Sequence, residues 1–262
     1  MIRIIDATLA YVDAYDPSKE QLYLFCSLIQ DIGITDLEIS RKVYEKLGLM
    51  PKDIRFYLAI DRLEDKRKYP GIYKFIYDDG VNTDNGMVEI KIADAGDLTK
   101  LNTYKQFSYL RITGLDNLLF YNYMLLFQDV KQCLTRSRVN FAPGNHYKCG
   151  SGCAAIWGIN GGSEVTTSFN GLGEKAPTEE VIMALRLTAH YKPNQKMSAL
   201  PELSRLSEEI TKMKIPRNKP ILGSHIFFVE TDTHADGILN NPSNYEPYPA
   251  EIIGQKIKSE RL

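Results

Sequence analysis

Three side chains with metal-binding and nucleophilic chemistry lie close together in the chain. His146 is followed by Cys149 and Cys153, and an imidazole with two thiolates at this spacing can share a zinc ion. A structural zinc site normally has four protein ligands, and no second cysteine pair accompanies these residues. We therefore interpret both cysteines as buried thiols without a metal-binding role.

The composition of the chain excludes several classes of function. Of its 262 residues, 44% are hydrophobic and 25% are charged, and the formal net charge is -1. These values are typical of a globular protein, and without a basic stripe they give no support for nucleic-acid binding. No segment approaches the roughly 18 apolar residues of a membrane span. The absence of a signal sequence at the first residues, and four cysteines that fit reduced thiols, predict a cytoplasmic protein.

Short apolar segments rich in β-branched residues recur through the first two thirds of the chain. Most end at or near Asp, Gly, Asn or Ser, where strands commonly stop. The eight segments cover residues 3–8, 36–40, 54–60, 73–77, 88–93, 109–113, 139–142 and 165–169. Amphipathic segments with helical spacing separate several of them, for example 19–32, 117–134 and 152–160. This alternation predicts an α/β fold, a (β/α)₈ TIM barrel.

The predicted barrel has fewer outer helices than usual. Its strands occupy about 170 residues, whereas a typical barrel has roughly 250 residues. Residues 79–86 have the composition of a turn, and the connection after the third strand is also short. We therefore expect one or two outer helices to be missing.

The last third of the chain lacks the strand and helix alternation of the barrel segment. After a final barrel helix at residues 178–190, the sequence is polar and interrupted by prolines, with one amphipathic helix predicted at 201–214. We therefore divide the chain into a shortened barrel, residues 1–191, and an extended helical C-terminal appendage, residues 192–262.

Several segments resemble the homocitrate synthase and isopropylmalate synthase family of TIM-barrel acyltransferases. Residues 170–185 have the sequence NGLGEKAPTEEVIMAL, which is similar to the family's NGxGERAGN…LEEVVMAL. Further matches follow in the family's order: PRNKPILG (216–223), HADGILNNP (234–242) and NYEPY (244–248) resemble PPNKPIVG, GIHxDGVLKNP and TYEPF. At the other end, DATL (6–9) resembles DTTLRDGE.

The resemblance implies a Claisen condensation. Members of the family are acetyl-CoA-dependent acyltransferases that act on a 2-oxo acid bound to a divalent metal. The metal polarises the keto group, an arginine stabilises the developing oxyanion, and a general base removes a proton from the acetyl methyl group. The site lies at the C-terminal ends of the strands, and a histidine of the appended segment reaches the partner subunit's barrel. The resemblance thus implies a dimer, homo- or hetero-oligomeric, in which the appendage serves subunit association.

Only part of the family's metal site has a counterpart in this sequence. Asp6, near the end of the first strand, matches the metal carboxylate, and Asn170, at the end of the eighth, matches the amide ligand. A strand-end acid and a turn residue are the structural alternatives for these two positions. The family's HxHND falls on residues 142–146, so both metal histidines are absent and His146 is displaced. The resemblance therefore predicts that a divalent metal binds this chain weakly or not at all.

The remaining site residues match better in the tail than in the barrel. Glu230 and His234 match the Glu and the second His of the family's HESGIH, and we assign them as catalytic, with dimer packing as the alternative role of this motif. Thr113 matches the substrate-contacting threonine of the sixth strand. The oxyanion-stabilising arginine falls on Ala10 and the acid after it on Tyr11, so neither has a counterpart in the first strand.

Three functions are compatible with these matches. The first is a subunit of a split homocitrate synthase, of the kind that serves nitrogenase cofactor assembly in nitrogen fixation, paired with a full-length homocitrate synthase-like subunit. The second is a non-catalytic paralogue, a pseudoenzyme that binds a small acid or a partner protein. The third is an enzyme of altered chemistry with Glu38, Glu89, Lys91 and Asp94 in its pocket. We favour the first, with acetyl-CoA and a 2-oxo acid as the family's substrates.

Overall fold

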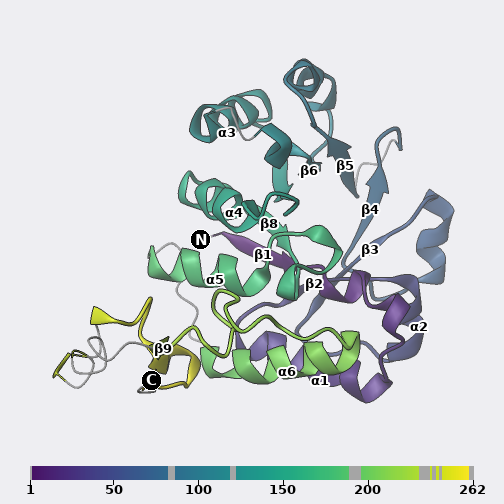
Figure 1. Ribbon diagram of the computed structural model, residues 1–262. Coiled ribbons are helices and arrows are strands. Elements are labelled where there is room, and N and C mark those ends of the chain that lie inside the picture. Colours follow the sequence, from purple (N-terminus) through teal and green to yellow (C-terminus); the bar gives the residue numbers. More distant parts are fainter. Residues whose placement is uncertain are drawn as a thin grey trace.

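The chain folds into a closed barrel of eight parallel strands (Figure 1). The computed structural model describes residues 2–81, 86–118, 122–188, 196–229, 237, 240–241 and 244–259. The strands are β1 Arg3–Asp6, β2 Asp36–Ile39, β3 Arg55–Ala59, β4 Lys74–Asp78, β5 Met87–Lys91, β6 Tyr109–Thr113, β7 Arg138–Ala142 and β8 Glu164–Thr167. β1 pairs with both β2 and β8, which closes the barrel. The predicted TIM barrel is confirmed.

Helices cover only part of the outside of the barrel. They are α1 Lys19–Asp31, α2 Arg41–Leu47, α3 Tyr123–Cys133, α4 Gly150–Ile159 and α5 Thr178–Leu187. The connections after β3 and β5 contain the 3-10 helices Leu63–Lys68 and Gly96–Tyr104 instead, and a turn at residues 79–80 follows β4. No helix within the described part of the chain is long and apolar enough to cross a membrane.

Local sequence determines where the first two helices begin. Ser18 and Gln21 form a capping box at α1, in which the Ser18 hydroxyl accepts from the Gln21 N–H at 3.2 Å and the Gln21 side chain accepts from the Ser18 N–H at 2.9 Å. Such reciprocal bonds satisfy N–H groups that the helix itself leaves unpaired. Ser40 caps α2 by accepting from the Val43 N–H at 3.0 Å.

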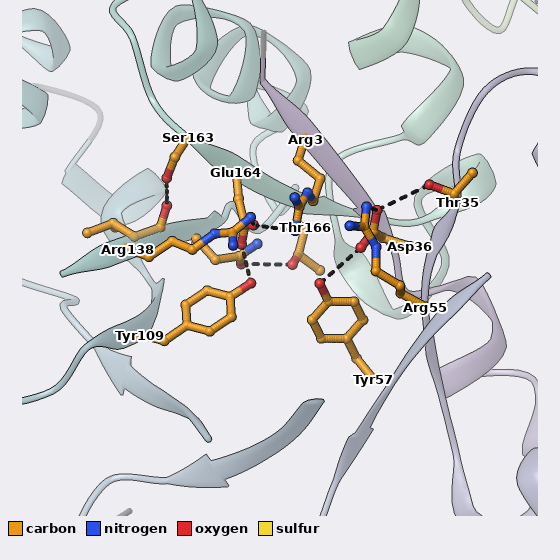
Figure 2. Close-up of polar contacts among 12 residues, drawn as sticks. Arg3, Thr35, Asp36, Arg55, Tyr57, Tyr109, Arg138, Ser163, Glu164 and Thr166 are labelled. Atoms are coloured by element: carbon orange, nitrogen blue, oxygen red, sulfur yellow. Dashed lines mark hydrogen bonds and ion pairs between the residues drawn. The ribbon is translucent and has the colours of Figure 1, made fainter. Parts of the chain in front are cut away.

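A layer of polar side chains closes the amino-terminal end of the barrel (Figure 2). Arg3 and Arg138 both pair with Glu164, and Tyr109 donates to the same carboxylate. On the other side of the barrel, Asp36 pairs with Arg55 at 2.6 Å and accepts from the Tyr57 hydroxyl at 3.0 Å. Most of these residues are the first of their strands. Because TIM-barrel active sites form at the opposite end, we interpret this layer as structural.

The segment after the barrel lies against its outer helices. Helix α6, Leu200–Thr211, packs along α1 (Figure 1), close to the predicted helix at 201–214. Farther on, β9 Phe228–Val229 and β10 Lys258–Ser259 form a parallel pair. The proposed boundary between residues 191 and 192 lies outside the described residues, so the division into two domains stays a prediction.

Candidate functional site at the carboxyl end of the barrel

A polar pocket of about 310 Å³ lies at the carboxyl ends of the strands. Interior positions of β2, β4, β5 and β6 contribute to its wall, together with the loops after β1 and β8. Its charged and hydroxyl-bearing lining residues are Tyr11, Glu38, Ser40, Arg41, Asp61, Asp78, Glu89, Arg111 and Lys175. The pocket is where a TIM barrel normally carries its site, and its size suits a small ligand.

A buried arginine organises the charges of this pocket. Arg111 is 2% exposed, and its Nη2 lies 2.7 Å from Oε2 of Glu38 while its Nη1 lies 3.4 Å from Oε2 of Glu89. Burial lowers the pKa of the Arg111 guanidinium, but the two carboxylates raise it by more, so the group stays charged. Two carboxylates on one guanidinium leave the cluster with a net negative charge. The charge of Arg111 is therefore already balanced by side chains of the barrel itself.

The structure brings together only some of the residues considered for altered chemistry. Glu38 and Glu89 both line the pocket, whereas Lys91 is exposed at the end of β5. The Asp94 carboxylate instead accepts from the Asp97 N–H at 3.0 Å. Sequence reasoning missed Arg111, although its alternation with Tyr109 along β6 was a signal that its side chain points inward.

Tyr11, in the loop after β1, lines the pocket. The pKa of Tyr11 rises to about 12 through burial and the nearby Glu38, so its hydroxyl keeps its proton. The ring of Tyr11 packs on Gly173, where an added Cβ would lie 2.6 Å from it. Gly173 has a φ of +66°, a conformation that glycine adopts without strain. Close packing of the Tyr11 ring therefore requires glycine at position 173, the second glycine of the NGLG segment.

Asp6 lies on the outer side of the barrel. Ile5 belongs to the interior cluster and Ile4 to the core beneath the helices, and alternation along β1 places Asp6 on the side of Ile4. Its carboxylate is fully buried and accepts from the Thr8 N–H at 2.9 Å and from the Thr178 hydroxyl at 2.5 Å. Burial raises the pKa of Asp6 to about 6, and these hydrogen bonds oppose that rise.

Asn170 points toward helix α6. Its φ is +58°, its N–H donates to Glu179 at 3.0 Å, and its Nδ2 donates to the Ser207 hydroxyl at 3.0 Å. Its Oδ1 is buried without a hydrogen-bond partner among the described residues. Asn170 therefore has the geometry of a turn residue that joins the eighth strand to the appended segment.

These positions do not fit a divalent metal held by Asp6 and Asn170. Both oxygens of Asp6 are used by Thr8 and Thr178, which leaves Oδ1 of Asn170 as the one oxygen of these two side chains without a partner among the described residues. A divalent ion needs several oxygen or nitrogen donors that converge on one point. Among the described residues, no group of three or more His, Cys, Asp or Glu side chains is arranged to hold a metal.

The other predicted site residues are spread over the structure. The Thr113 hydroxyl donates to the Ile90 carbonyl at 3.2 Å and is not part of the pocket. Glu230 and His234 lie outside the described residues.

His146, Cys149 and Cys153 do not converge on one site. His146 pairs with Glu174 at 3.0 Å, and Cys153 is buried in α4 as expected. Cys149 is exposed, so its prediction as a buried thiol was wrong. It stands at the N-cap position of α4 without a side-chain capping bond, and its thiol donates to the Tyr147 carbonyl at 3.4 Å.

Comparison with known proteins decides the family. The chain is 30% identical to the homocitrate synthase omega subunit of Clostridium pasteurianum over 263 residues, which is 92% of this chain and 74% of that protein. The chain belongs to the homocitrate synthase and isopropylmalate synthase family. It is also 44% identical to the homocitrate synthase AksA of Methanothermobacter thermautotrophicus, over 38% of this chain and 26% of that protein. No model of a known protein family matches it.

Solved structures agree with the barrel at much lower identity. The hydroxymethylglutaryl-CoA lyase of Pseudomonas aeruginosa superposes with a TM-score of 0.65 at 9% identity, over 81% of this chain and 94% of that one. The carboxyl transferase domain of Rhizobium etli pyruvate carboxylase gives 0.62 at 10% identity, over 80% of this chain and 47% of that one. At these identities the likeness shows the fold alone.

Proposed function

We propose that this chain is a subunit of a homocitrate synthase-type acyltransferase and acts with a full-length, homocitrate synthase-like subunit. The observation that carries the proposal is the similarity over 92% of the chain to a protein named as an omega subunit. The matches to AksA and to the 2-isopropylmalate synthase of Methanocaldococcus jannaschii cover only 26% and 20% of those proteins. These two matches are also confined to 38% and 37% of this chain, so the similarity to the omega subunit covers much more of it.

The geometry of the barrel supports a complex in which the two subunits have different roles. Asp6 is turned toward α5, and Arg111 is neutralised by Glu38 and Glu89. In the proposed complex the partner binds the metal and the 2-oxo acid, and this chain contributes His234, with Glu230, as acid/base groups to the partner's site. Association through residues 192–262 would place these groups there.

A reconstitution assay tests the proposal. Release of CoA from acetyl-CoA would be measured with 2-oxoglutarate, 2-oxoisovalerate or pyruvate, using the chain alone, the full-length partner alone and the two together. We expect no turnover by the chain alone and a large gain when the subunits are mixed. A partner that is equally active without the chain, or that does not bind it, would contradict the proposal.

The second candidate is a non-catalytic paralogue that binds a small acid. The polar pocket favours this candidate, because it can hold a small ligand although no metal donors converge among the described residues. Calorimetry with 2-oxoglutarate on the chain alone separates the two: binding without any effect on the partner's activity would favour the paralogue.

A further inference from the structure

The pocket contains a lysine that the proposed function does not use. Lys175 lines the pocket and is half-buried. Its backbone is held on both sides, because the Asn145 N–H donates to the Glu174 carbonyl at 2.8 Å and the Ala176 N–H donates to the Pro143 carbonyl at 3.1 Å. The loop between β8 and α5 is thereby fixed to the loop after β7. A lysine on such a fixed loop has a defined position relative to the pocket.

Lys175 is half-buried, and its ammonium has no ion-pair partner among the described residues. Within the described ranges, no carboxylate lies at ion-pair distance from it and no hydrogen bond to it is present. Glu38 and Glu89, the carboxylates on the same pocket wall, are already engaged by Arg111. Burial and the Arg111 charge lower the pKa of Lys175, while Glu89, Glu38 and Asp116 oppose this shift. The neutral, nucleophilic form therefore makes up a larger fraction of Lys175 than of an exposed lysine at the same pH.

The carboxylates on the pocket wall favour a cation that forms after the amine has reacted. The cluster of Arg111 with Glu38 and Glu89 has a net negative charge, and Asp78 lies on the same wall. A fixed negative charge stabilises a positive group that develops in a partly desolvated pocket. Tyr11 retains its proton and can donate a hydrogen bond to an oxygen in the pocket.

We propose that Lys175 forms a Schiff base with a small carbonyl compound bound in this pocket. The neutral Nζ attacks the carbonyl carbon, and a proton then passes from the nitrogen to the former carbonyl oxygen, which gives a neutral carbinolamine. A second proton transfer lets the hydroxyl leave as water, so that amine, carbonyl compound and one proton give the iminium ion and water. Glu89, whose side chain is 34% exposed, can relay that proton from solvent. The step requires no oxidant, reductant or metal.

Reductive trapping of the purified chain tests the proposal. The chain alone would be incubated with sodium cyanoborohydride and either pyruvate or propanal, which share the carbonyl group and differ in the carboxylate. Intact mass measurement and peptide mapping then count and locate the adducts. We expect one dominant adduct, on Lys175, and the more reactive of the two probes tells whether the pocket accepts a carboxylate.

Three variants make the test specific. Lys175→Arg keeps the charge and should lose the dominant adduct, whereas Lys148→Arg, a change of an exposed lysine, should keep it. Glu89→Gln should lower the trapping rate by roughly tenfold or more. Adducts spread evenly over exposed lysines, or an undiminished adduct in a folded Lys175→Arg chain, would overturn the proposal. Since neither acetyl-CoA nor a partner is present, this outcome is independent of the subunit function.

Discussion

Nζ of Lys219 lies 2.8 Å from Oε1 of Glu179, a carboxylate with no exposed surface. The same ammonium lies 3.2 Å from Oε1 of Glu180. Burial raises the pKa of Glu179, and Lys219 opposes that rise. Lys219 comes from the PRNKPILG segment and Glu179 from the first turn of α5. This ion pair therefore fastens the appended segment to the barrel.

Replacing Lys219 with Ala should destabilise the fold strongly. The change leaves Glu179 buried without its cation, and breaking one side of a buried pair typically costs about 3–5 kcal/mol. Urea unfolding followed by circular dichroism measures the loss. The control is Lys214→Ala, because the Lys214 side chain is 89% exposed and its surface pair with Glu208 should contribute less than about 1 kcal/mol. Equal effects of the two changes would show that the Lys219 contact contributes little.

Asp6 should make the stability of the protein depend on pH. Its pKa rises from 3.8 to about 6 in the folded state, so the native protein binds this proton more tightly than the unfolded chain. Its contribution to stability therefore falls as the pH rises from about 4 to about 6, by roughly 3 kcal/mol at most, and then stays constant.

Asp6→Asn should remove that fall in stability. Free energies of unfolding measured between about pH 4 and pH 7 would show a flatter profile than the parent protein. Asp129→Asn, at an exposed position of α3, is the control and should keep the parent profile. A variant at Asp6 with an unchanged profile would mean that this carboxylate titrates normally.

A pair of glycine substitutions tests the packing at the pocket mouth. Gly173→Ala places a methyl group 2.6 Å from the Tyr11 ring at a φ of +66°, and the steric clash and backbone strain should cost about 2 kcal/mol or more. Gly152 lies in α4 with nothing within 4 Å of an added Cβ. Gly152→Ala should therefore stabilise the protein by up to about 1 kcal/mol. Thermal unfolding of both variants would show opposite signs.

The chain alone should bind divalent metal weakly or not at all. Both oxygens of Asp6 have other partners. That leaves Oδ1 of Asn170, and a single donor competes poorly with the hydration of an ion. Titration calorimetry with zinc, manganese and magnesium measures the affinity. Binding at micromolar concentration or tighter would contradict the prediction, and His146→Ala and Cys149→Ala would then locate the ligands.

His234→Ala should impair the mixed complex without preventing its assembly. A general acid or base typically contributes about 10²–10⁴-fold to the rate, so CoA release should fall by that factor while gel filtration still shows the complex. His146→Ala is the matched control, because His146 is an exposed histidine paired with Glu174. If the His234 variant assembles and remains fully active, the tail motif serves only in packing.

The sequence by itself determined the barrel and most of its elements. Each strand was predicted to within two residues at either end, because short segments rich in β-branched residues end near residues that commonly stop a strand. Helix α2, Arg41–Leu47, is too short to show two turns of amphipathic spacing, and it was not predicted. The sequence also contained the family's motifs, which depend on residue type and order alone.

Only the tertiary structure decided what faces the pocket. Arg111, Glu38 and Glu89 come from β6, β2 and β5, and they meet because closure of the barrel points alternate residues of every strand toward one axis. The same alternation turns Asp6 away from that axis and toward Thr178. A strand-end acid looks the same in the sequence on either face, since a shift of one residue exchanges the inside of a barrel for its outside.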